Sequence, residues 1–323
     1  MASHLTLEER EVIAQMHRAG KMQTQIADRL GRSKSTISRE LRRNRSRNGY
    51  WAVAAQGKAQ RRRSERPWTA KMRRPEVRRY VAKRLRQRWS PDQIAGRSRS
   101  DFPHDRRRWI SPPTIYAWIG AEQERGKRWH RYLRRLGRKR PEWEKRGRLP
   151  ASASIAGRPA VVDRRSRFGD WEGDTIVGAN RRGGAVTLVE RKSGYLLLGK
   201  VPNLQVATVR QVAARRYATT PAVLRKTLTL DNGKEFAEHE QLEVEAALKI
   251  YFAKPYSAWQ RGTNENTNGL VRQFFPKGTD LANIPEHRFT KVQQLLNDRP
   301  RKRLGYRSPN EVLASRLKVA TET

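Results

Sequence analysis

Three acidic residues in the second half of the chain have types and positions that could do chemistry. Asp174 lies in a predicted strand, GDWEGDTIVGA, and Asp231 follows another predicted strand, LRKTLTLDNG. Glu265 lies early in a predicted helix, within GTNENTNGL. Ligand sites in open α/β sheets gather at strand ends, and this helix could project Glu265 toward Asp231. The sequence therefore predicts one site formed by the three acids.

A cluster of three carboxylates indicates a divalent metal site. Like charges repel and raise one another's pKa, and Mg²⁺, which prefers carboxylate oxygens, removes that repulsion. Two Mg²⁺ ions about 4 Å apart can activate a nucleophile and stabilise the leaving 3′-oxygen of a phosphodiester, and Mn²⁺ can substitute. Arg261 and Arg272, on the predicted helix of Glu265, could hold phosphate near the ions. The predicted chemistry is metal-dependent phosphoryl transfer.

Each acid also has a structural interpretation. Asp231, in the turn sequence DNG, could be a turn residue, and Glu265 could be an acid favoured by the dipole in the first turn of a helix. Asp174 competes with Asp170 and Glu172, which alternate onto the same face of the predicted strand. The spacing of the acids alone does not exclude these structural interpretations. The occurrence of all three acids together favours a common site over them.

The charge of the chain indicates a polyanionic partner. The 323 residues include 71 Lys and Arg against 31 Asp and Glu, a formal net charge of +40. Residues 1–150 hold 42 basic and 14 acidic residues, a net of +28, and the remainder has a net of +12. Release of counterions from phosphate makes double-stranded DNA the expected partner. The first half is predicted to bind the DNA, and the second half keeps acids for chemistry.

Several classes of protein are excluded by the same composition. The chain has no cysteine, which excludes disulfides and thiolate zinc sites, and its six histidines form no close pair. No apolar run approaches the roughly 20 residues of a membrane span, and the N-terminus lacks an apolar signal core. We expect a protein without a membrane partner, cytoplasmic and associated with the nucleoid.

Residues 1–50 are predicted to form a DNA-binding helix-turn-helix domain. Apolar residues recur at helical spacing in three short segments of residues 5–44, with stops at Gly20 and Gly31. An ordinary three-helix bundle with a solvated polar face would have the same pattern, and the charge asymmetry favours DNA binding. The outward face of the third segment carries side chains suited to phosphate and base edges: Lys34, Ser35, Thr36, Ser38, Arg39, Arg42 and Arg43.

The rest of the chain divides by composition and periodicity. Residues 75–130 are predicted to form a second helix-turn-helix-like set, between a basic linker at 51–74 and a basic connector at 131–165. From residue 166 to 300 the predicted order is β-β-β-α-β-α-β-α, typical of a mixed five-stranded sheet with helices on its faces. Residues 301–323 form a C-terminal tail.

Several motifs resemble those of a known family. The segments are WEGDTI (171–176), TLDNGKEF (229–236), WQRGTNENTNGLVRQFFPKG (259–278), RPRKRLGYRSPNEVL (299–313), TISRELRRN (36–44), WSPDQIAGR (89–97) and TIYAWI (114–119). They are similar to those of the DDE transposases of bacterial insertion sequences, within the retroviral-integrase-like group. More narrowly, they resemble the family named after insertion sequence thirty, over nearly the whole chain.

The resemblance implies an RNase H-like catalytic domain with Asp174, Asp231 and Glu265 as its three acids, and it implies roles for Arg261 and Arg272. It also implies circular intermediates and a homo-oligomer that pairs two element ends. The expected function is a transposase that binds terminal inverted repeats and catalyses strand cleavage and strand transfer on DNA. The alternatives are a non-enzymatic DNA-binding repressor and a simple RNase H-like nuclease, which would cut without joining.

Overall fold

The computed structural model describes residues 4–64, 70–134, 155–254 and 258–321. The chain forms two compact units, residues 1–70 and residues 71–323. The first unit extends past residue 50, where we expected the DNA-binding domain to end. Most of the expected basic connector, residues 135–154, lies outside the described residues. No helix in the described ranges is long and apolar enough to cross a membrane.

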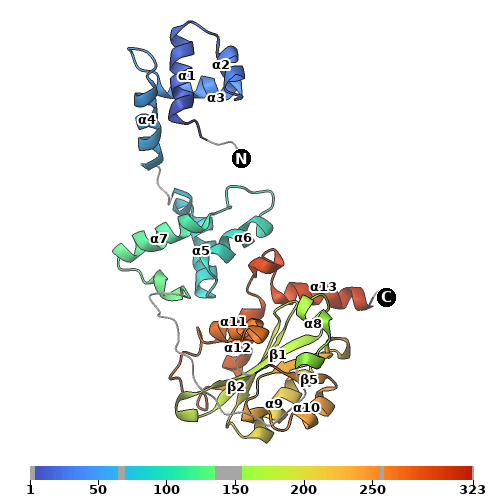
Figure 1. Cartoon of the computed structure of the whole chain (residues 1–323). Helices are drawn as coiled ribbons and strands as arrows, with labels where there is room; N and C mark the ends of the chain where they lie inside the picture. The colour runs from blue at the N-terminus through green and yellow to red at the C-terminus, as the bar shows by residue number, and fades with distance from the viewer. Residues whose placement is uncertain (1–3, 65–69, 135–154, 255–257, 322–323) are drawn as a thin grey trace. The chain divides into compact units, whose positions relative to one another are not determined.

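The first unit is built from short helices around one core (Figure 1). They are α1 (Leu7–Arg18), α2 (Gln23–Arg29), α3 (Lys34–Asn44) and α4 (Ala52–Ser64). Thr6 and Glu9 exchange hydrogen bonds at the start of α1, because each side chain accepts from the backbone N–H of the other residue. Ala52 and Ala55 of α4 pack into the core of α1–α3, so this part of the expected linker belongs to the folded unit.

The second unit begins with the helical set expected at residues 75–130. It contains α5 (Pro75–Arg86), α6 (Pro91–Asp101) and α7 (Pro112–Glu124). Proline occupies the first turn of each helix, where the missing N–H has no helical partner to lose. The apolar stripe of α5 packs against α6 and α7 in a core that includes Val77, Val81, Leu85, Ile94, Ile115, Trp118 and Ile119.

A five-stranded sheet follows, with the order β3-β2-β1-β4-β5. Its strands are β1 (Asp170–Val177), β2 (Gly184–Glu190), β3 (Leu196–Val201), β4 (Thr227–Leu230) and β5 (Lys249–Phe252). The first three strands pair antiparallel, whereas β4 pairs parallel with both β1 and β5. Parallel pairing requires a crossover, here made by helices. The predicted mixed five-stranded sheet is confirmed.

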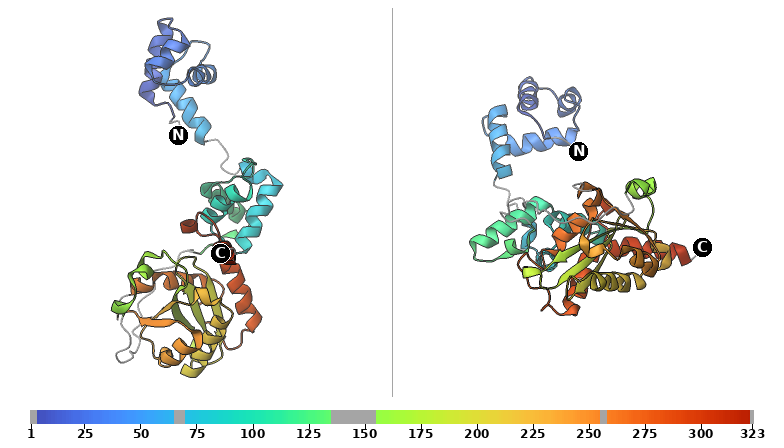
Figure 2. Two further views of the ribbon diagram at one scale, coloured as in Figure 1. Left: turned by 90° about the vertical axis from the view of Figure 1, so that its right-hand side faces the viewer. Right: turned by 60° about the horizontal axis from the view of Figure 1, so that its bottom comes forward.

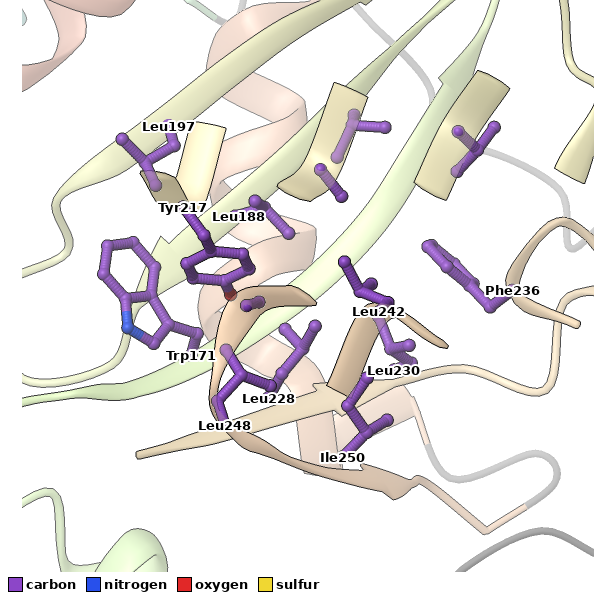
Figure 3. Packing of buried hydrophobic residues seen from close by; sticks show 14 of the residues in the cluster. Trp171, Leu188, Leu197, Tyr217, Leu228, Leu230, Phe236, Leu242, Leu248 and Ile250 are labelled. Carbon is purple, nitrogen blue, oxygen red and sulfur yellow. The ribbon is translucent and has the colours of Figure 1, made fainter. Parts of the chain in front are cut away.

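Helices cover both faces of this sheet (Figures 1 and 2). One core joins the sheet to α9 (Val206–Ala218) and α10 (His239–Ala246). A second core joins the other face to α11 (Gly262–Val271) and α12 (Glu286–Asn297). In the first core the rings of Trp171 and Tyr217 meet edge to face, with centroids 5.5 Å apart (Figure 3). Strand β1 is therefore held between two hydrophobic layers.

The C-terminal segment docks onto α6. The Arg97 guanidinium donates to Glu311 Oε2 at 2.7 Å and to the Tyr306 carbonyl oxygen at 3.2 Å. Arg299 Nε donates to Gln93 Oε1 at 2.7 Å. Part of the expected tail thus forms a helix, α13 (Pro309–Thr321), and two motifs far apart in the sequence, WSPDQIAGR and RPRKRLGYRSPNEVL, are in contact.

We predict opposite effects for two glycine-to-alanine substitutions in neighbouring helices. A Cβ at Gly96 would overlap the ring of Tyr306, so Gly96→Ala should lower the free energy of unfolding by about 1–3 kcal/mol. A Cβ at Gly120 of α7 meets no atom within 4 Å, so Gly120→Ala should raise the free energy of unfolding by up to about 1 kcal/mol. Denaturant unfolding checks both. Equal stability of the two variants would contradict the packing of α6 on Tyr306.

A pH-dependent contribution follows from the same contact. The hydrogen bond from Arg97 lowers the pKa of Glu311 to about 2, from 4.5 for a free side chain. Because the folded pKa is depressed, the contact stabilises the protein above about pH 4.5, and this contribution disappears as the pH falls toward 2. Glu311→Gln should lower the melting temperature at pH 7, and its difference from wild type should narrow below pH 4.5. A difference that is constant down to pH 2.5 would exclude this role.

Candidate active site

The parallel pairing of β1 with β4 brings two of the predicted acids together. Glu172 lies opposite Thr229 in this pairing, and the same register continued by two residues sets Asp174 level with Asp231, on the same face. One guanidinium contacts both carboxylates. Arg261 Nη2 lies 3.1 Å from Asp231 Oδ2, and Arg261 Nη1 lies 3.9 Å from Asp174 Oδ2.

Helix α11 adds polar side chains to the same place. Asn268 Nδ2 donates to Asp174 Oδ2 at 2.8 Å, and Arg272 donates to the carbonyl oxygen of Val177, at the end of β1, at 2.9 Å. Glu265 lies three residues before Asn268, so the two share one side of the helix. Its carboxylate is exposed and has no hydrogen bond or ion pair with the described residues. The structure thus brings Asp174 and Asp231 together and leaves Glu265 out of contact with them.

A buried acid of β1 holds the first turn of α11. Glu172 Oε2 accepts a hydrogen bond from the backbone N–H of Asn264 at 2.8 Å, which satisfies one of the N–H groups left free at a helix start. Glu172 Oε1 lies 3.0 Å from Nη1 of Arg191, and both side chains are buried. Burial lowers the pKa of Arg191, and the Glu172 carboxylate opposes this effect. This ion pair therefore connects the centre of the sheet to the helix that carries Glu265.

Strand β1 carries three acids that were all candidates for the site, and the structure gives them different partners. Asp170 is buried, pairs with Arg167 at 2.9 Å and accepts from the Thr227 hydroxyl at 2.8 Å. Glu172 is engaged by Arg191, as described above. Asp174 is half-buried and faces a pocket, so it is the acid of this row that is open to a ligand.

The pocket beside Asp174 has a volume of about 810 Å³. Its charged and polar lining residues, besides Asp174, are Thr175, Arg181, Lys234, Glu235, Asn268, Arg272 and Lys277. Of this set, sequence reasoning had singled out Arg272. For Asn268 the helical spacing from Glu265 was an available signal, whereas the turn sequence NRRGG contains nothing that points Arg181 to the site.

The Asp174–Asp231 pair fits a hard divalent cation. Both residues offer carboxylate oxygens, which Mg²⁺ prefers, and the Arg261 guanidinium already lies in contact with both as a positive charge. Within the described ranges, no group of three or more His, Cys, Asp or Glu side chains could hold a metal ion. The fit therefore rests on two carboxylates, with Glu265 on the adjacent helix.

The polar face predicted on the third helix lies open on α3. Its side chains are exposed, except that of Thr36, which is half-buried and whose hydroxyl lies 2.9 Å from that of Ser33. Ile37 and Leu41 point into the core on the opposite side. Ser33 caps the helix by accepting from the Thr36 backbone N–H. The basic face of α3 is thus available to a partner.

Comparisons with known proteins give one family match and one structural alignment. The family described as a helix-turn-helix domain matches residues 2–44. The crystal structure of the catalytic core domain of BIV integrase aligns with 48% of this chain and 99% of its own, with a TM-score of 0.38 and 19% sequence identity.

Transposases align with the chain over almost its whole length. The transposase for insertion sequence element IS4351 of Bacteroides fragilis is 38% identical over 96% of this chain and 95% of its own. Transposase InsI for insertion sequence element IS30A of Escherichia coli (strain K12) is 39% identical over 96% of this chain and 83% of its own. The transposase for insertion sequence element IS1086 of Cupriavidus metallidurans is 40% identical over 92% and 90%. At this identity and coverage, the chain belongs to the IS30 family of insertion-sequence transposases.

Proposed function

We propose that the chain binds the terminal inverted repeats of its own insertion sequence and catalyses metal-dependent strand cleavage and strand transfer by direct in-line phosphoryl transfer. The observation that carries this proposal is the contact of one guanidinium, that of Arg261, with the carboxylates of both Asp174 and Asp231, where Asp174 lines a pocket rich in basic side chains. Carboxylates bind metal ions, and basic side chains bind phosphate. A site that has both therefore suits a phosphodiester substrate.

Asp174, Asp231 and Glu265 are the proposed metal ligands and catalytic residues. Two Mg²⁺ ions bound there, or Mn²⁺ in their place, would supply Lewis acids for the attacking and the leaving oxygen. Glu265 lies three residues before Asn268, whose side chain contacts Asp174, and we propose that another rotamer of Glu265 turns its carboxylate toward the other two acids.

The other polar groups of the site bind and orient. Asn268 donates to one oxygen of Asp174 and so fixes the direction of the carboxylate. The guanidinium groups of Arg261 and Arg272 are suited to hold the phosphate that reacts. The chemistry requires no covalent protein–DNA intermediate, so no Ser or Tyr nucleophile is assigned.

The exposed side of α3 is the proposed reader of the element ends. Its basic and hydroxyl side chains suit phosphates and base edges in the major groove: Lys34, Ser35, Thr36, Ser38, Arg39, Arg42 and Arg43. Transfer of an element with two ends requires both ends in one complex, so we infer a homo-oligomer on double-stranded DNA. The proposed location is the cytoplasm, on the nucleoid.

Removing any one of the three acids should abolish catalysis without abolishing binding. Asp174→Asn, Asp231→Asn and Glu265→Gln should each lower the rates of cleavage and joining of an inverted-repeat duplex more than about 100-fold. Residues that only hydrogen-bond to metal ligands typically have effects of about 10- to 100-fold. Joining is measured with Mg²⁺, and binding by gel shift. The matched control is Glu240→Gln, an exposed acid in the first turn of α10. Joining by Glu265→Gln at the level of this control would remove Glu265 from the site, and binding without cleavage by wild type would favour a repressor.

The ion pair beneath α11 gives a stability prediction. Glu172→Ala leaves the Arg191 guanidinium buried without its nearest carboxylate, so it should lower the free energy of unfolding by about 3–5 kcal/mol. Glu286→Ala removes the exposed partner of Arg216 and should cost less than about 1 kcal/mol. Urea unfolding measures both. A Glu172→Ala variant as stable as Glu286→Ala would show that the buried pair does not hold α11.

A further inference from the structure

The turn between β1 and β2 has a backbone that side chains rarely adopt. Asn180 and Arg181, in the short helical turn η4 (Ala179–Arg181), have φ angles of 49° and 58°. Both lie in the left-handed region, which is unfavourable for residues with a Cβ. Successive residues of this kind persist where the surroundings hold them, and such positions cluster at ligand sites.

The surroundings of this turn are rigid on one side. The backbone N–H of Ala179 donates to the Thr279 carbonyl oxygen at 2.9 Å, and Arg182 Nε lies 3.2 Å from Asp280 Oδ2. At Gly183 even a Cβ would overlap the backbone of Ala282. The turn is therefore fixed against residues 279–282 by a backbone hydrogen bond and close packing, whereas the exposed ion pair of Arg182 contributes little.

This fixed turn carries Arg181 to the pocket of Asp174. The Arg181 side chain lines the pocket, is exposed, and has no hydrogen bond or ion pair with the described residues. Its neighbour Arg182 does not line the pocket and pairs with Asp280 instead. The two adjacent arginines of this turn thus have different environments. Arg181 lines the pocket, whereas Arg182 pairs with Asp280.

The charged lining of the pocket suits an anionic ligand that carries more than one charge. Its lining carries four basic side chains, Arg181, Lys234, Arg272 and Lys277, against two carboxylates, Asp174 and Glu235. Successive phosphates of a DNA strand follow at about 3.4 Å along the helix axis. A strand whose reacting bond lies at Asp174 therefore presents neighbouring phosphates to the walls of the same pocket. Arginine suits that position because its planar fork can donate two parallel hydrogen bonds to one phosphate.

We propose that Arg181 is a substrate-binding residue that donates to a backbone phosphate of the DNA strand next to the reacting bond, and that the strained β1–β2 turn exists to present it. This inference rests on the proposed function, since it assigns part of the DNA path through the same site.

Joining kinetics test the role of the charge. In the full-length chain, Arg181→Ala should lower Mg²⁺-dependent joining of a pre-cut element end about 10- to 100-fold, the range expected for a lost charge-assisted hydrogen bond. Arg181→Lys should recover part of the loss, and Arg182→Ala should stay within about 2-fold of wild type. Equal joining by Arg181→Ala and Arg182→Ala would overturn the inference and leave the proposed function intact.

Crosslinking tests the contact without any catalysis. Because the chain has no cysteine, Arg181→Cys introduces a single thiol, and Arg182→Cys is its matched control. A duplex end with an activated mixed disulfide tethered to the phosphate beside the cleavage position should exchange with the thiol of Arg181→Cys, releasing the activating thiol, and should not exchange with Arg182→Cys. Crosslinks of equal yield at both positions would refute the contact. A selective crosslink by a chain whose wild type joins no DNA would instead refute the proposed reaction and retain the phosphate contact.

Discussion

The parallel register between β1 and β4 is the constraint on which the site depends. It sets two carboxylates, Asp174 and Asp231, side by side on one face of the sheet, where like charges repel. The surrounding structure answers this repulsion with positive charge and with hydrogen-bond donors from α11. The same row of β1 contains Asp170 and Glu172, and each of these already has an arginine of its own. Asp174 is the acid of this row that lines the pocket, and its partners Arg261 and Asn268 come from α11 and the turn before it.

Much of the fold followed from patterns that are local in the sequence. Strand alternation and turn residues predicted the five strands and their class of sheet, since each strand carries its own period and stop signals. The helical spacing of apolar residues in residues 5–44 was readable for the same reason. The role of α4 was less visible, because its two small core residues, Ala52 and Ala55, precede a basic run at 58–63 that suggested a linker.

The candidate site was predictable in part. Its acids and flanking arginines stand out in short motifs, whereas the groups that orient them depend on contacts between distant segments. Glu172 meets the first turn of α11 across 92 positions of sequence, and no local pattern announces that contact. Arg181 is equally hidden, because the direction of its side chain is decided by backbone angles that residues 279–282 impose. Sequence therefore indicated the candidate acids better than the residues that hold them in place.

The contact between Gly96 and Tyr306 has a consequence for how this chain can diverge. The ring of Tyr306 occupies the volume in which any side chain at position 96 would begin. Positions 96 and 306, separated by more than half of the chain, thus share one volume. The size of the side chain that fits at one position depends on the residue at the other. Among descendants of this sequence, a larger residue at 96 is expected to appear only after, or together with, a smaller one at 306.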